Sequence, residues 1–263
     1  MKRRTLATVS SLFVCGSLMG QPLYDQDVTP DVIFGSGNAN GSFTVDRSNS
    51  IEVGLRGKLR FDETNSPQNT FNSNGDGSYT FRTGTPPTGF GFAPNAPTTP
   101  VWNFEWSVNT DFDDLSGAKL SDYTYRLFMD ADPTSGTNFL EFDPINDFSV
   151  ADHALGDNST GNGGGSVATN AADYATLLGD SNVAQNSWSY EFFNDVGTPL
   201  ENFDPNVKGS YIIGLGVYDD LGAELAYSEI EITPVPEPSL IAFLGLGGLG
   251  GFLFLRRRYR AKK

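Results

Sequence analysis

The sequence has little cysteine, little histidine and few basic residues, and each shortage excludes a class of protein. A single cysteine, Cys15, cannot form a disulfide within the chain, and one cysteine with one histidine, His153, cannot make a Cys/His zinc cluster. A His-based catalytic triad would have to use His153. Only 17 Lys and Arg residues stand against 32 Asp and Glu, which gives a net charge of −15. Because nucleic-acid binding needs a basic face, we predict no nucleic-acid partner.

The few basic residues are concentrated at the two ends of the chain. Residues 1–20 hold three basic and no acidic side chains, and residues 236–263 hold six basic and one acidic. The residues between them keep the remaining eight basic and 31 acidic side chains, a net charge of −23. This asymmetry indicates that the ends and the body of the chain meet different solvents.

The N-terminal segment has the layout of a secretory signal peptide. Three basic residues at positions 2–4 precede an uncharged, mildly apolar run from Leu6 to Met19. That run is shorter than the roughly 20 residues that a membrane-spanning helix needs. We therefore predict a signal peptide over residues 1–20, with cleavage after Ser17 and after Gly20 both left open.

The C-terminal segment combines three features in order. The motif Pro236, Glu237, Pro238 comes first, an uncharged apolar run of 16 residues follows at 240–255, and a basic cluster that includes Arg256, Arg257 and Arg258 comes last. As a helix the run would cover about 24 Å of a roughly 30 Å hydrocarbon core, and Ser239 and snorkelling arginines can extend it. We predict a transmembrane segment over residues 239–255 and a basic tail over 256–263, which the positive-inside rule keeps in the cytoplasm. The acidic body then lies across the membrane, as the signal peptide independently requires.

This order closely resembles the PEP-CTERM sorting signal of Gram-negative bacteria, and the resemblance covers residues 234–263. In that family an exosortase, an integral membrane thiol protease, recognises the tail and removes it near the Pro-Glu-Pro motif. The resemblance implies the exosortase, the secretion machinery and the inner membrane as partners. It also implies an exported protein that passes through a membrane-anchored intermediate to the cell surface or the extracellular space. A plain C-terminal anchor is the alternative.

The body, residues 21–233, is typical of β-structure. Apolar and polar residues alternate with the period of two that a half-buried strand requires. The alternating stretches are 51–61, 102–108, 123–129, 188–192 and 211–217, and shorter candidates lie at 42–46, 79–82, 139–142 and 225–232. In the first stretch we expect Glu52, Arg56, Lys58 and Arg60 on the solvent face. We predict an all-β fold, a single antiparallel β-sandwich or jelly-roll-like domain flanked by the signal peptide and a transmembrane helix.

One short helix is expected within this β domain. Asn170 can cap its first turn, Tyr174, Ala175 and Leu178 are spaced for one face, and Gly179 ends it. His153 lies in a loop-like stretch, where we expect an exposed, non-catalytic side chain.

An acidic stretch has the spacing of calcium ligands. Asp130, Asp132, Thr134 and Glu141 stand at offsets 1, 3, 5 and 12 of a calcium-binding loop. Ser135 stands where that loop needs glycine, and the flanking residues are typical of strands. The same residues make a natural hairpin turn. Calcium at these four residues is the one cofactor that the sequence suggests, and a plain turn is the alternative.

Three classes of function are compatible with the sequence. As the resemblance implies, PEP-CTERM proteins occur in bacteria that make exopolysaccharide, and many look like constituents of the biofilm matrix. Our leading prediction is therefore a non-enzymatic structural protein of the cell surface or extracellular matrix, with exopolysaccharide as a candidate partner and no catalytic residue. The second class is a carbohydrate-binding β-sandwich, in which Trp102, Trp106 and Trp188 would stack on sugars unless they belong to the core. The third is a secreted hydrolase, for which no carboxylate pair is singled out.

Overall fold

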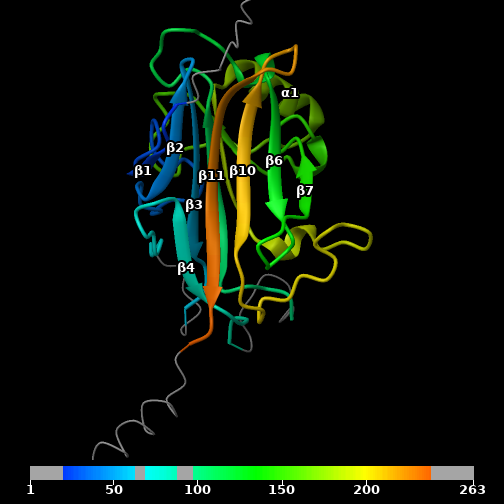
Figure 1. The fold of residues 1–263 in the computed structure, drawn as a ribbon. Helices are drawn as coiled ribbons and strands as arrows, with labels where there is room; N and C mark the ends of the chain where they lie inside the picture. The colour runs from blue at the N-terminus through cyan, green and yellow to red at the C-terminus, as the bar shows by residue number, and fades with distance from the viewer. Residues whose placement is uncertain (1–19, 63–68, 88–96, 238–263) are drawn as a thin grey trace, which may run out of the picture.

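The computed structural model describes residues 20–62, 69–87 and 97–237, which form two β-sheets packed face to face (Figure 1). Sheet A has six strands in the order β1-β2-β3-β5-β9-β8, and all neighbouring strands are antiparallel. Its strands are β1 (Leu23–Gln26), β2 (Phe43–Ser48), β3 (Ile51–Leu59), β5 (Trp102–Asn109), β9 (Val183–Trp188) and β8 (Ala154–Gly156).

Sheet B has five strands in the order β4-β11-β10-β6-β7. Its strands are β4 (Ser78–Arg82), β11 (Glu224–Val235), β10 (Tyr211–Tyr218), β6 (Thr124–Asp130) and β7 (Phe139–Phe142). β11 returns antiparallel to β10 and then runs parallel to β4 along its last five residues. The predicted β-rich fold is confirmed, but a strictly antiparallel arrangement is wrong, because β11 lies between β10 and a strand that runs in its own direction.

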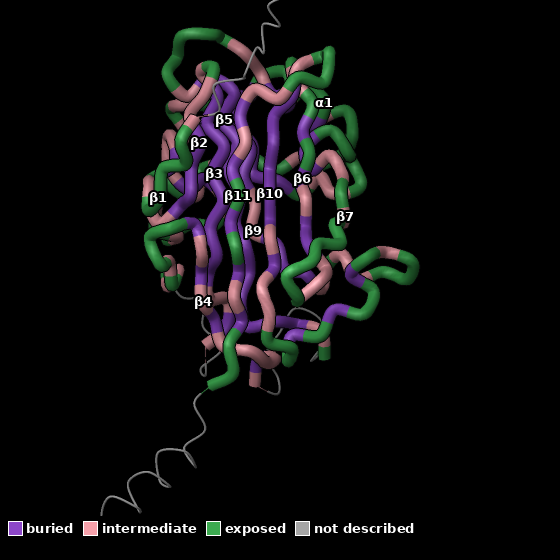
Figure 2. The backbone as a smooth tube through the Cα atoms, in the orientation of Figure 1, coloured by how far each residue is buried: buried purple, intermediate pink, exposed green. Residues whose placement is uncertain are grey.

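Alternating apolar side chains of the two sheets form the core. The central strands β5 and β10 are accordingly buried along most of their length (Figure 2). Trp102 and Trp106 of β5 and Trp188 of β9 are 1%, 0% and 3% exposed. They pack with side chains such as Ile213 and Leu215 of β10 in one continuous cluster. The three tryptophans are therefore core residues, and their rings are not available for stacking on a sugar.

The outer face of β3 is buried as well, which corrects the expectation that it meets solvent. Segment 27–42 covers that face, and its backbone exchanges hydrogen bonds with the side chains there. Glu52 accepts from the Thr29 N–H at 2.6 Å. Arg56 donates to the Gly41 carbonyl at 2.6 Å. Alternation with a period of two shows which face of a strand is polar, but it does not show whether another part of the chain covers that face.

A buried ion cluster lies on the same outer face. Glu105 of β5 pairs with Arg56 (Oε2–Nη2 2.5 Å) and with Lys58 (Oε1–Nζ 3.0 Å), and the three side chains are 0%, 0% and 4% exposed. The Arg56 guanidinium also lies between the rings of Phe43 and Phe71, 4.1 Å and 3.8 Å from their centroids. Burial lowers the pKa of Arg56, and the charge of Glu105 opposes that shift. Charges buried in this way require their partners.

The strand predicted at 188–192 is displaced. β9 occupies Val183–Trp188, and Tyr190–Phe193 form a 3-10 turn instead. Gln185 of β9 is polar yet buried, because its side chain accepts a hydrogen bond from the Ile33 N–H at 2.7 Å. Because Gln185 is polar, the sequence of β9 lacks the apolar alternation by which the other strands were predicted. The short strands β1 and β8 were not predicted, and the other predicted strands are all present near their expected positions.

The single predicted helix is confirmed as α1 (Ala171–Asp180). The Asn170 side chain accepts from the backbone N–H groups of Ala172 and Asp173, which caps the first turn. Tyr174 and Leu178 face the core, whereas Ala175 is exposed. The helix continues through Gly179 and ends at Asp180, one residue beyond the predicted stop.

The described chain begins and ends at opposite ends of the sandwich (Figure 1). Gly20 lies beside Asp46, whose carboxylate accepts a hydrogen bond from the Tyr227 N–H near the start of β11. Glu237 follows the far end of the same strand. β11 also continues to Val235, so the sheet extends past the boundary expected at residue 233.

Most of the predicted targeting segments lie outside the described residues. These are residues 1–19 of the signal peptide, the transmembrane segment 239–255 and the basic tail 256–263. Within the described ranges, no helix is long and apolar enough to cross a membrane.

Candidate functional site

The Pro-Glu-Pro motif starts directly after the last strand of the sandwich. The Val235 carbonyl, at the end of β11, accepts a hydrogen bond from the Thr83 N–H at 2.9 Å. Glu237 Oε1 lies 3.5 Å from Nε of Arg82 on β4, and the two side chains are 67% and 28% exposed. An exposed pair of this kind contributes about 0–1 kcal/mol, so Glu237 stays accessible. Pro238 and Arg256, Arg257 and Arg258 lie outside the described residues.

The predicted calcium ligands lie in and beside the hairpin turn between β6 and β7. Asp130 Oδ1 accepts from the N–H groups of Asp132 (3.0 Å) and Asn138 (2.8 Å). Asp132 in turn accepts from the Thr134 N–H at 2.9 Å, which lowers the pKa of Asp132. Glu141 pairs with Arg126 on β6 instead (3.6 Å). In the part of the chain that the structure describes, no group of three or more His, Cys, Asp or Glu side chains is arranged to hold a metal ion.

Calcium binding by this turn stays a prediction that thermal unfolding can test. A ligand that binds only the folded state raises stability by RT ln(1 + [L]/Kd), about 2.7 kcal/mol at 100 times Kd. We expect a higher Tm in millimolar calcium than in a chelator, and Asp132→Asn should remove the difference. Asp219→Asn is the matched control, because Asp219 also accepts backbone hydrogen bonds in a hairpin turn. An identical Tm with and without calcium would contradict the prediction.

His153 is buried, which corrects the expectation of an exposed loop residue. Its Nε2 lies 2.5 Å from the Pro144 carbonyl oxygen, and its Nδ1 lies 3.3 Å from the Asn186 amide nitrogen. Since a carbonyl can only accept, Nε2 carries the proton and Nδ1 accepts from Asn186. The ring also packs against Trp106, with centroids 5.0 Å apart. Burial lowers the pKa of His153 to about 4, so the imidazole is a neutral part of the core at pH 7.

We expect His153 to weaken folding in acid. Its pKa falls from an ordinary 6.5 to about 4 on folding, so below pH 6.5 the unfolded state binds the extra proton. The free energy of unfolding is therefore unaffected by protonation of His153 above pH 6.5. It falls by about 2–3 kcal/mol as the pH drops toward 4. Urea unfolding of wild type and His153→Gln at pH 7 and pH 4.5 measures this. Between these pH values His153→Gln should lose about 2–3 kcal/mol less free energy of unfolding than the wild type. Equal losses would contradict a buried, neutral His153.

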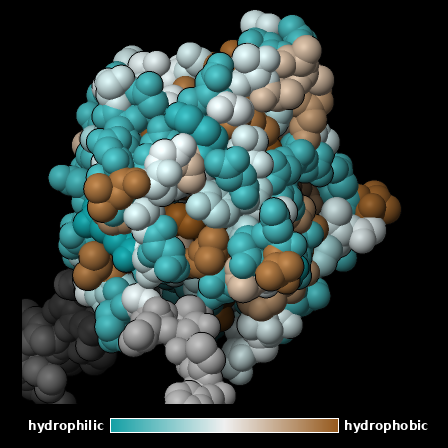
Figure 3. All heavy atoms as spheres, turned by 90° about the horizontal axis from the view of Figure 1, so that it is seen from above, coloured by the Kyte–Doolittle hydropathy of each residue, from teal (hydrophilic) through white to brown (hydrophobic). Residues whose placement is uncertain are grey.

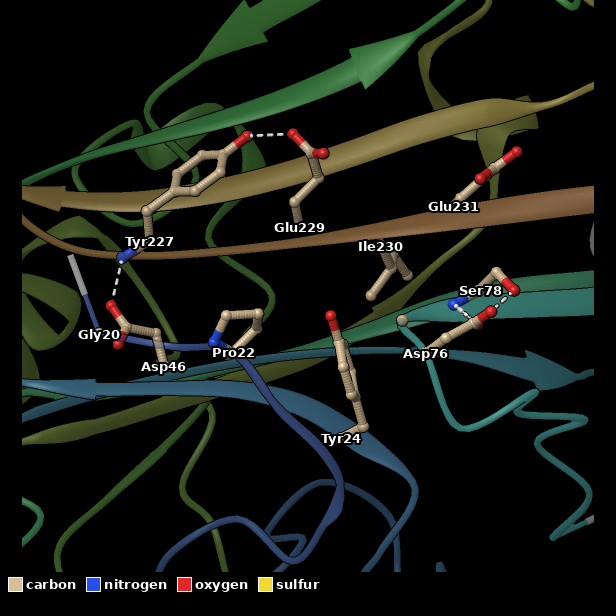
Figure 4. Close-up of a pocket in the computed structure, with 11 residues that line it drawn as sticks. Gly20, Pro22, Tyr24, Asp46, Asp76, Ser78, Tyr227, Glu229, Ile230 and Glu231 are labelled. Carbon is tan, nitrogen blue, oxygen red and sulfur yellow. Dashed lines mark hydrogen bonds between the residues drawn. The ribbon is translucent and has the colours of Figure 1, made fainter.

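A cleft lies at the open edge of the sandwich, between β1 of sheet A and strands β4 and β11 of sheet B (Figure 4). We call it the edge cleft. Its volume is about 400 Å³, and its lining includes the side chains of Pro22, Tyr24, Asp46, Asp76, Tyr227, Glu229 and Glu231. The backbone of Gly77 also forms part of the cleft wall, and the Tyr24 ring packs against it.

The edge cleft exists because β4 is shorter than β11. β4 pairs only with Glu231–Val235, so the first half of β11 has no neighbouring strand on that side among the described residues. The Tyr227 N–H on this edge donates to Asp46 of β2 at 2.9 Å. The Glu231 N–H donates to the Gly77 carbonyl at 3.0 Å. Between these two contacts, no described residue hydrogen-bonds to the edge of β11.

Negative charge dominates the edge cleft. Four acidic side chains line it, those of Asp46, Asp76, Glu229 and Glu231, and its described lining contains no Lys or Arg. Ser78 donates its N–H and its hydroxyl to Asp76 (3.0 Å and 2.6 Å), which lowers the pKa of Asp76. The Tyr227 hydroxyl donates to Glu229 at 2.8 Å, and burial together with this carboxylate raises the pKa of Tyr227. The cleft therefore attracts cations and hydroxyl donors and repels anions.

Aromatic side chains continue from the edge cleft across the outer face of sheet B. Phe128 of β6 contacts Tyr227 and Phe139 of β7, with ring centroids 6.4 Å and 5.9 Å apart. The Tyr227 ring lies over Gly214 of β10, where a Cβ atom would collide with it. We call Tyr227, Phe128 and Phe139 the aromatic row. Glycine in this central strand lets the ring lie close to the sheet.

Sequence reasoning missed the edge cleft. Its side chains come from four separate stretches of the chain, and Tyr24 lies on a strand that was not predicted. The available signal was the alternation of Tyr227, Glu229 and Glu231 on one face of β11, since a period of two places them side by side.

The fold and the tail junction define the class of protein, a β-sandwich whose last strand leads directly into a C-terminal sorting segment. Residues 234–258 match the family model of the PEP-CTERM protein-sorting motif. The predicted resemblance is confirmed, and the chain is a protein with a PEP-CTERM sorting motif at its C-terminus. The motif indicates an exported protein that an exosortase sorts through a membrane-anchored intermediate. Comparisons with curated proteins and with solved structures found no match.

Proposed function

We propose that the protein is a non-enzymatic component of the cell surface or extracellular biofilm matrix of a Gram-negative bacterium. The observation that carries this proposal is the position of the sorting motif. β11 ends at Val235, and Pro236 and Glu237 follow it outside the sheet. Cleavage near the motif would therefore release the whole sandwich without removing any strand from its two sheets. The product would be a folded, acidic domain outside the membrane.

A non-catalytic role is supported by the environment of the single histidine. Both ring nitrogens of His153 have polar contacts, and the ring is packed within the core. An imidazole held in this way has no open nitrogen for general base catalysis.

Carbohydrate binding is a second candidate function, and a specific observation favours it. The buried tryptophans cannot provide the stacking surface, but the aromatic row and Tyr24 are partly exposed on the outside of the sandwich. Exopolysaccharide is therefore the proposed partner of the released domain.

The location of the protein with and without the exosortase tests the main proposal. An epitope inserted beside Leu221, which is 93% exposed in the β10–β11 turn, reports the location without disturbing the core. We expect the protein at the cell surface or in the medium of the exosortase-positive strain, and in the inner-membrane fraction of the negative strain. Finding it in the same fraction of both strains would refute the proposal.

A further inference from the structure

We propose that the edge cleft and the adjoining aromatic row bind a polysaccharide chain of hexosamine units that carry free amino groups. This inference deepens the proposed function, because it names the binding surface and the sugar chemistry of the matrix partner. Stacking, an open strand edge and charge each support it.

The stacking surface begins at Tyr24 in the edge cleft. Tyr24 is 37% exposed and Phe139 at the far end of the aromatic row is 38% exposed, so rings are accessible at both ends. Pro22 lies two residues before Tyr24 and lines the same cleft. A pyranose ring presents an apolar face of C–H groups, and flat apolar side chains of this kind are the surface on which it packs.

The open strand edge offers hydrogen-bonding groups beside that surface. Between Tyr227 and Glu231 the edge of β11 pairs with no described residue, so backbone polar groups face the cleft. The carboxylates of Glu229, on β11, and of Asp76, just before β4, line the same cleft (Figure 4). Sugar hydroxyls both donate and accept hydrogen bonds, which matches a site with backbone groups and carboxylate acceptors. A volume of about 400 Å³ is also within the range of small-molecule sites.

The two parts form one surface because they share a residue. Tyr227 lines the edge cleft and also contacts Phe128 in the aromatic row. Tyr24 and Tyr227 line the same cleft, so a sugar chain held at Tyr24 can cross it to Tyr227 and continue along the aromatic row toward β7. This continuity favours a polymer over a single sugar.

Charge selects the kind of polymer. The cleft carries four carboxylates, those of Asp46, Asp76, Glu229 and Glu231. Arg126, beside the aromatic row, lies over the Tyr218 ring (5.0 Å) and pairs with Glu141. A protonated amine is stabilised next to such carboxylates, and a uronate or sulfate is repelled. The site is therefore complementary to an amine-bearing chain.

A second aromatic hollow serves as an internal control. It lies beside Trp188, is about 510 Å³ in volume and contains Phe148, which is 50% exposed. Asp152 is the one carboxylate among its described lining residues. Phe148→Ala thus removes an exposed aromatic ring from a place that lacks the acidic groups of the edge cleft.

Calorimetric titration of the exported protein tests the inference. The probes are a glucosamine hexamer, the N-acetylated hexamer and a galacturonate hexamer, all at low salt. We expect the glucosamine hexamer to bind at least ten times more tightly than the acetylated one, and the galacturonate hexamer not to bind. Tyr24→Ala should weaken binding of both hexosamine probes about tenfold or more. Glu229→Gln should weaken only the glucosamine hexamer, and Phe148→Ala should change neither.

Three results would overturn the inference: no binding of the glucosamine hexamer, equal binding of the galacturonate hexamer, or loss of binding in Phe148→Ala with retention in Tyr24→Ala. Tyr24 is exposed on an edge strand, so unchanged Tm of Tyr24→Ala separates loss of the site from loss of the fold. Failure of this inference is also distinct from failure of the proposed function. If the protein binds no hexamer but still reaches the cell surface, only this inference fails. If it binds the glucosamine hexamer but stays in the inner membrane, only the proposed function fails.

Discussion

Replacement of Glu105 by alanine is expected to lower the free energy of unfolding by about 3–5 kcal/mol. The Glu105 carboxylate is fully buried and pairs with Arg56 and Lys58 at 2.5 Å and 3.0 Å. The variant leaves both cations buried without their counter-charge, and Arg56 cannot turn to water because two aromatic rings enclose it. This penalty is large because removal of one partner from a buried pair leaves the other uncompensated.

Urea unfolding at pH 7 measures this loss. Glu141→Ala is the matched control, because Glu141 pairs with Arg126 at the surface, where both side chains are about half exposed. That substitution should cost less than about 1 kcal/mol. A Glu105→Ala variant that is as stable as Glu141→Ala would show that the outer face of sheet A does not depend on its buried charges.

The alternating strands were predictable where apolar side chains on one face alternate with polar or small side chains on the other. The stripes at 102–108 and 211–217 correspond to β5 and β10, because the two-residue period is a local property of the chain. The burial of Arg56 was not predictable, because it depends on segment 27–42, which is distant in sequence. Likewise, Gln185 is polar by type but bound to the backbone of Ile33, so β9 lacked an apolar stripe.

The two candidate sites differ in the same way. The sorting motif was predictable because Pro236, Glu237 and Pro238 are contiguous with their apolar and basic partners. The edge cleft was not, because it depends on how far β4 extends along β11. The pairing stops at Glu231, and no local pattern in the sequence indicates that end.

The second large effect is expected at the tail. Glu237→Ala should abolish processing of the C-terminus, whereas a plain membrane anchor would tolerate the substitution. Glu237 contributes little to stability because its side chain is largely exposed. The substitution therefore tests recognition and not folding. Arg82→Gln is the matched control: it removes the ion-pair partner of Glu237 and leaves the motif intact, so processing should continue.

The central claim, that an exosortase sorts this protein through its tail, is tested most directly by the mass of the mature C-terminus. The full-length protein is expressed in strains with and without the exosortase, and its C-terminal peptide is identified by mass spectrometry. We expect the wild-type protein to lack Arg256–Lys263 only when the exosortase is present, and Glu237→Ala to keep these residues in both strains. A wild-type protein that retains Arg256–Lys263 in both strains would contradict the claim and leave the segment as a simple anchor.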